Sequence, residues 1–196
     1  MLYLNQLNYP DIPYEHNVAA GGPPEGKGNV AAAGCGPCCL CMMVENLTTE
    51  HLDLMDCLKM SADLKANMER GTDLKILGKA VAEKFGLGYS TTSDIEVLAD
   101  HLRRGGMAVA NAGGDREGYN AVFSHGGHYI AVISVDGDTA CVLDPSYKPG
   151  KYEEEGRQGK VAVAEPFVYC SLEVLRKDCE NRDPSFYLFS RKKAEV

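Results

Sequence analysis

Three residue types that carry nucleophilic chemistry occur in an informative order along the chain. Cys35 lies in a Gly-Cys-Gly-Pro motif at residues 34–37, where an apolar helical pattern begins. The free amide hydrogens and partial positive charge at a helix start favour a thiolate over a thiol. His128 begins an apolar segment and Asp144 ends the next one. An imidazole that takes the thiol proton and a carboxylate that orients it would complete a Cys-His-Asp system.

Two of these assignments have competitors in the sequence. His125 lies in the polar loop before His128 and could serve as the base instead. We favour His128 because a strand supports an imidazole more rigidly than a loop does. Asp144 precedes Pro145, and an Asp-Pro pair often forms only a turn. Its orienting role is therefore a hypothesis that needs the fold.

Helices are expected mainly in the first half of the chain. Apolar residues recur at helical spacing over 36–47, 73–85 and 94–104, and more weakly over 50–60. Ser93 and Glu96 have the spacing of a capping box for the third of these helices.

Strands are expected in the second half, at 107–110, 128–135, 139–143 and 186–189. The segment 128–135 is apolar on both faces, which is typical of a central strand. Helices followed by an antiparallel sheet indicate an α+β fold. We expect one domain over residues 1–196, with a helical part at about 35–105 and a sheet part at about 106–190.

The hairpin between the second and third strands decides whether His128 and Asp144 can meet. Residues 136–138, with the sequence Asp-Gly-Asp, are a hairpin signal. A regular two-residue turn would place the histidine and the aspartate on opposite faces of the sheet. We therefore predict a three-residue turn or a β-bulge between Val135 and Leu143.

Composition and charge exclude several classes of protein. The 196 residues are 44% apolar with a formal net charge of −8, and the only basic run is the short tail at 191–193. This pattern argues against nucleic-acid binding. No apolar stretch approaches the length of a membrane span, and residues 1–15 lack the pattern of a signal peptide. We interpret most of the eight cysteines as small core side chains that form no disulfides. Because free thiols are typical of a reducing compartment, we expect a cytoplasmic protein. The sequence gives no indication of the oligomeric state.

The same residues carry a resemblance to a known family. The motif at 34–37, with the methionines at 42–43 in the helix, resembles the nucleophile motif of papain-like cysteine peptidases. More narrowly, it is similar to the stand-alone branch of the bacteriocin-processing, double-glycine-leader peptidase-like family. Residues 127–130 and 144–146 resemble the His and Asp segments of that family, and residues 4–6 resemble its N-terminal segment. The cysteines at 38–39 depart from the family pattern, which has Thr and Ser there.

The resemblance implies a papain-like fold and a cysteine peptidase that acts on a peptide or amide without metal or organic cofactor. Cys35, His128 and Asp144 would form the catalytic triad. Gln6 would donate its side-chain amide to the oxyanion, alongside the backbone N–H of Cys35.

Two alternatives from other classes remain. The chain could be a peptide-binding module of the same fold with an inactive site. The Cys-x-x-Cys spacings that join Cys35, Cys38 and Cys41 could instead belong to a metal or redox site. No separate pair of ligands completes such a site elsewhere in the sequence.

Overall fold

The computed structural model describes residues 1–14, 28–68 and 71–192. Most of the Gly/Pro-rich loop expected at residues 19–28 falls outside these ranges, as does part of the basic tail. No helix in the described ranges is long and apolar enough to cross a membrane.

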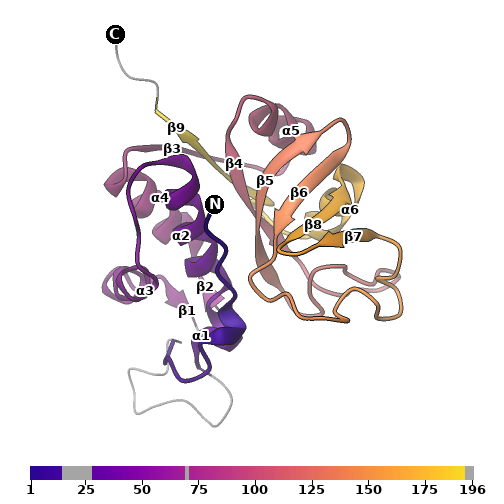
Figure 1. Cartoon of the computed structure of the whole chain (residues 1–196), viewed down its shortest axis with the longest axis horizontal. Helices are drawn as coiled ribbons and strands as arrows, with labels where there is room; N and C mark the ends of the chain where they lie inside the picture. Colours follow the sequence, from indigo (N-terminus) through magenta and orange to yellow (C-terminus); the bar gives the residue numbers. More distant parts are fainter. Residues whose placement is uncertain (15–27, 69–70, 193–196) are drawn as a thin grey trace.

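The helices fall into two groups (Figure 1). The short helix η1 and α1–α4 lie together on one side of the molecule, and α5 and α6 lie on the other side of the sheet. Their bounds are Gln6–Asn8 for η1, Val30–Ala33 for α1, Cys35–Leu47 for α2, Leu54–Asp63 for α3, Leu74–Lys84 for α4, Ile95–Arg103 for α5 and Leu172–Cys179 for α6.

A seven-stranded antiparallel sheet runs through the molecule in the order β3-β9-β4-β5-β6-β8-β7. Its strands are β3 (Leu87–Thr92), β4 (Met107–Ala112), β5 (His128–Asp136), β6 (Thr139–Leu143), β7 (Val161–Ala164), β8 (Phe167–Ser171) and β9 (Phe186–Arg191). The short strands β1 (Asn67–Met68) and β2 (Gly71–Thr72) form a separate pair.

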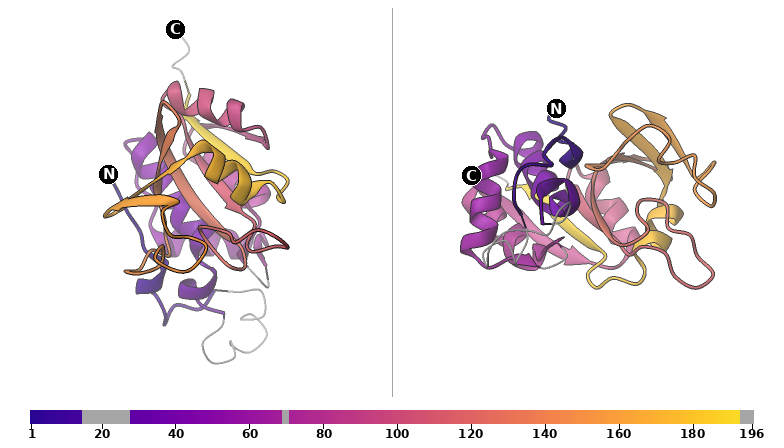
Figure 2. Two further views of the ribbon diagram at one scale, coloured as in Figure 1. Left: turned by 90° about the vertical axis from the view of Figure 1, so that its right-hand side faces the viewer. Right: turned by 90° about the horizontal axis from the view of Figure 1, so that it is seen from below.

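Apolar cores lie on both faces of the central strands. Val109 of β4 and Ala131 of β5 pack into the core that α2–α4 cover. Ala110 and Ile130 of the same strands pack into the core shared with α5 and α6. The two side views show helices on both sides of the strongly twisted sheet (Figure 2). This burial on both faces explains why the β5 sequence is apolar without alternation.

Most of the expected elements are present, with local corrections. The helices expected at 36–47, 73–85 and 94–104 are α2, α4 and α5, and α3 starts later than the expected 50–60. The capping box was wrong: Asp94, not Ser93, caps α5 by accepting from Glu96 N at 2.8 Å. Ser93 Oγ instead accepts from Ser185 N. Strands β3, β7 and β8 and helix α6 were not predicted.

The hairpin contains a bulge, but outside the range in which it was predicted. Asp136 pairs with Thr139 across a two-residue turn, and the register then shifts between Val132 and Ser134, which leaves Ile133 unpaired. The bulge therefore lies in β5, opposite β6, rather than between Val135 and Leu143 in sequence. The extra residue brings the start of β5 and the end of β6 to the same face of the sheet.

Candidate active site

Cys35 is the first residue of α2, and its side chain is buried at the junction with α1. The junction is tight, because a Cβ on Gly34 would lie only 2.6 Å from the carbonyl oxygen of Val30. On the other side, a Cβ on Gly36 would lie 3.1 Å from the Cβ of Thr72. The two glycines therefore let α1 and β2 approach the start of α2 closely.

The structure brings Cys35, His128 and Asp144 together. His128 is the first residue of β5, and its Nε2 lies 2.7 Å from Asp144 Oδ1, just beyond the end of β6. The Cys35 thiol lies against the imidazole of His128, close enough for each group to shift the pKa of the other. Since Nε2 faces Asp144, Nδ1 is the ring nitrogen left for the thiol. His128 is 7% exposed and Asp144 is 0% exposed, so water does not compete for their hydrogen bond.

His125, the competing histidine, lies apart from this group. Its side chain is exposed and pairs with two carboxylates, Asp115 at 2.6 Å and Glu154 at 2.8 Å. These two hydrogen bonds raise the pKa of His125. Of the two candidates, only His128 contacts both Cys35 and Asp144.

The group is electrostatically biased towards a thiolate and an imidazolium. Burial alone would raise the pKa of Cys35, but the contact with the His128 imidazole and nearby backbone groups outweighs burial, and the pKa is lowered. Burial would lower the pKa of His128, but its hydrogen bond to Asp144 and the contact with Cys35 raise it. The pKa of Asp144 lies well below its usual range because its bonds to His128 and to Lys151 outweigh burial. Each group therefore favours the charged form of its neighbour.

Asp144 is held by residues that the sequence analysis missed. Lys151 Nζ donates to Asp144 Oδ2 at 2.6 Å and to Ser146 Oγ at 2.8 Å. Tyr152 donates its hydroxyl to the same carboxylate oxygen. Ser146 Oγ also lies 2.9 Å from Nε2 of His128. Lys151 and Tyr152 lie in a loop whose sequence indicates only a polar segment, so no sequence pattern identifies them as site residues.

Gln6 lies in η1, and its side chain is buried. Its backbone N–H donates to Pro145 O at 2.7 Å, which ties η1 to the residue after Asp144. Its side-chain Nε2 donates to Ala31 O at 2.8 Å, in the helix that leads to Cys35. This bond uses one of the two amide hydrogens of Gln6 and leaves the second for another acceptor. Gln6 is thus placed between the two segments that carry the nucleophile and the carboxylate.

The cysteines after Cys35 behave as core residues. Cys38, Cys39 and Cys41 are fully buried in α2, and burial raises the pKa of Cys38 and Cys39 well above its usual value. Within the described residues, no group of three or more His, Cys, Asp or Glu side chains could hold a metal ion. All eight cysteines are free and buried. The pKa of Cys35, in contrast to those of Cys38 and Cys39, is lowered.

The fold is shared with two solved structures. A protein from Bacillus anthracis described as a C39-like peptidase superimposes with a TM-score of 0.56 and 12% identity, over 94% of this chain and 96% of that one. The peptidase domain of Streptococcus ComA, a bifunctional ABC transporter involved in a quorum-sensing pathway, gives a TM-score of 0.52 and 13% identity. That match covers 81% of this chain and 91% of the other.

No family model matches the chain, and no curated protein matches it. The structural matches define the class of fold: the chain has the α+β fold of C39-like peptidases. The predicted fold class is thereby confirmed.

Proposed function

We propose that this protein is a cysteine peptidase whose nucleophile is Cys35. The observation that carries the proposal is the contact of the Cys35 thiol, at a helix start, with a buried His128–Asp144 pair. A thiol placed there is more acidic than a free cysteine, and an imidazole in contact with it can accept its proton. The fold shared with C39-like peptidases supports a peptide substrate.

In the proposed acylation step, the Cys35 thiolate attacks the carbonyl carbon of an amide bond. The backbone N–H of Cys35 and the free amide hydrogen of Gln6 stabilise the negative charge on the oxygen. His128, as an imidazolium, donates its proton to the leaving amine, and a thioester remains on Cys35. His128 then takes a proton from water, which attacks the thioester and releases the acid. Asp144 holds the ring orientation throughout.

Lys151 is proposed as a positioning residue for the same reaction. Its ammonium group is buried against the Asp144 oxygen that faces away from His128. This charge keeps Asp144 ionised and fixes the carboxylate plane, so that the other oxygen stays aimed at Nε2 of His128. Burial lowers the pKa of Lys151, although the contact with Asp144 opposes that shift.

Selective alkylation of Cys35 tests the proposed ion pair. With limiting iodoacetamide at neutral pH, mass spectrometry should find Cys35 modified ahead of the other seven cysteines, because its pKa is lowered. His128→Ala should abolish this selectivity, since burial without the imidazole raises the pKa of a thiol. His125→Ala, which removes the other local histidine, should leave the labelling unchanged. Equal labelling of several cysteines in the wild type would contradict the proposal and favour an inactive binding module.

The proposed oxyanion role of Gln6 predicts a kinetic effect. Gln6→Ala should reduce kcat/KM for a cleaved peptide by about 10²- to 10³-fold, because one oxyanion donor is removed. Cys35 alkylation should be nearly unchanged, since alkylation forms no oxyanion. Asn5→Ala is the matched control, because it removes the side-chain bond to Tyr147 O and the cap that Asn5 gives η1 by accepting from Leu7 N, while it keeps the side-chain amide of Gln6. Equal rates for Gln6→Ala and Asn5→Ala would refute the role.

A further inference from the structure

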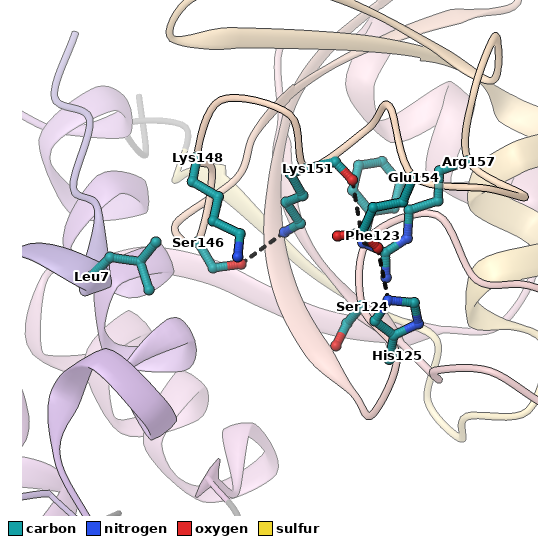
Figure 3. A pocket seen from close by; sticks show the side chains of 9 residues that line it. All are labelled: Leu7, Phe123, Ser124, His125, Ser146, Lys148, Lys151, Glu154 and Arg157. Carbon is teal, nitrogen blue, oxygen red and sulfur yellow. Dashed lines mark hydrogen bonds and ion pairs between the residues drawn. The ribbon is translucent and has the colours of Figure 1, made fainter. Parts of the chain in front are cut away.

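A pocket of about 250 Å³ lies beside the His128–Asp144 pair. Ser146 and Lys151, which both contact Asp144, form part of its wall. Figure 3 shows Leu7, the residue after Gln6, on the side of Ser146 and Lys148, away from His125 and Arg157. The pocket is therefore bounded by residues of both segments that flank the candidate active site.

Cationic side chains outnumber anionic ones in the wall of this pocket. Lys148, Lys151 and Arg157 line it, and Glu154 is the one carboxylate among the described lining residues. Lys151 forms an ion pair with Asp144, which lies behind the pocket wall, and Arg157 forms one with Glu154 at 3.0 Å. Lys148 then has no ion pair of its own among the described residues, and it acts on the Glu154 carboxylate only from a longer distance.

Lys148 and Arg157 both have capacity for a further acceptor. Lys148 is exposed, and in the described part of the chain no hydrogen bond or ion pair occupies its ammonium group. Arg157 has a side chain only 3% exposed, and its Nη2 is buried without a hydrogen-bond partner among the described residues. Because this nitrogen is fully buried, it lies behind the pocket wall, and Lys148 is the exposed lysine of that wall.

Glu154 is not free to neutralise Lys148. Its carboxylate already accepts from His125 Nε2 at 2.8 Å and pairs with Arg157. The hydrogen bond to His125 and the nearby charges of Arg157 and Lys148 lower the pKa of Glu154. The bonds to Asp115 and Glu154 raise the pKa of His125. His125 thus adds positive charge to the same wall when it is protonated. This local excess stands out in a chain whose formal net charge is −8.

We propose that this pocket binds a carboxylate group of the peptide substrate, with Lys148 as the residue that selects for it. The inference rests on the proposed peptidase function and adds a substrate class to it. The pocket has room for a side chain rather than for a large ligand. The carboxylate comes either from an Asp or Glu side chain near the cleaved bond or from the C-terminus of the substrate. Its charge would be drawn to Lys148, and the Ser146 hydroxyl lies in the same wall.

Paired peptide libraries test the proposal. The peptides are internally quenched and differ only in having Glu or Gln at one position. Each is made with a free and with an amidated C-terminus, and their rates of cleavage are compared. The wild type should prefer the acidic or free-acid member by about 5- to 10-fold in kcat/KM at low salt, and less as salt screens the charge. Lys148→Gln should remove the preference and Lys148→Glu should reverse it. Lys79→Glu, an exposed lysine of α4 with the same change in net charge, should keep it.

The possible outcomes distinguish a failure of this inference from a failure of the proposed peptidase function. Cleavage without any preference for a carboxylate, or a preference that survives in Lys148→Glu, would overturn the pocket assignment and leave the peptidase function intact. A preference that persists in amidated peptides assigns the carboxylate to a side chain, and one confined to free C-termini assigns it to the chain end. Failure to cleave every peptide would overturn both proposals.

Discussion

Replacing Cys35 by alanine should abolish peptide hydrolysis, with a fall in kcat of about 10⁵- to 10⁶-fold. The reason is that the thioester intermediate needs the sulfur, and no neighbouring group can replace it. Cys38 and Cys39 are nearest in sequence, but burial raises the pKa of both thiols and keeps them protonated. The measurement is the hydrolysis rate of any peptide that the wild type cleaves.

The fold should survive this substitution. Asp144 keeps its bonds to His128, Lys151 and Tyr152 when the thiol is removed, so thermal unfolding should shift by only a few degrees. Unchanged circular dichroism would show that the loss of activity is chemical.

Cys38→Ala is the matched control for the nucleophile. Cys38 lies in the same helix and is fully buried, so its truncation should cost about 1 kcal/mol of stability and leave activity within a few-fold of the wild type. Activity that persisted in Cys35→Ala but vanished in Cys38→Ala would place the nucleophile one helical turn away from the proposed position.

The helix start at Cys35 and the need for a bulge could be predicted from the sequence because both depend on local patterns. A Gly-Cys-Gly-Pro motif before an apolar pattern indicates a helix start, whatever the rest of the chain does. The need for a bulge followed from the two-residue period of a strand, without any knowledge of where β5 would pack. Ile133 supplies that bulge two residues before the expected range, because the parity argument fixes only that an extra residue exists and not where it lies.

The parts that were missed depend on contacts between distant segments. Strand β3 pairs with β9, about a hundred residues later, and its sequence is too mixed in polarity to stand out alone. Lys151 and Tyr152 are a lysine and a tyrosine in a polar loop, and a sequence gives no sign that such residues are buried. Their burial follows from Asp144, whose carboxylate needs donors inside the protein once water is excluded.

Lys151→Met should both weaken the fold and move the pH dependence of the site. The substitution keeps most of the side-chain volume but leaves the Asp144 carboxylate without its buried cation. Breaking a buried ion pair in this way should lower the free energy of unfolding by about 3 kcal/mol at neutral pH. Denaturant unfolding of the two proteins measures this difference.

The expected pH shift has a definite sign. The wild-type pKa of Asp144 is depressed, so its stabilising contribution is present above the unfolded-state pKa of about 4 and is lost as the pH falls through the depressed folded value. Without Lys151, the folded-state pKa of Asp144 rises, so this contribution is smaller and its loss is complete at a higher pH. The positive charge of Lys151 also favours the Cys35 thiolate, because opposite charges stabilise each other. The midpoint of Cys35 alkylation against pH should therefore move towards alkaline pH in Lys151→Met.

Tyr152→Phe separates positioning from packing. It removes a neutral hydrogen bond from the same oxygen of Asp144, and so it should reduce stability with a much smaller shift of the alkylation midpoint. Lys151→Arg, which keeps the charge, should hold the midpoint near the wild-type value even where its larger head group lowers stability. If Lys151 acts on the site through Asp144, removing its charge must change the ionisation of the Cys35 thiol. An alkylation midpoint that stayed fixed in Lys151→Met while stability fell would therefore show that Lys151 has only a structural role.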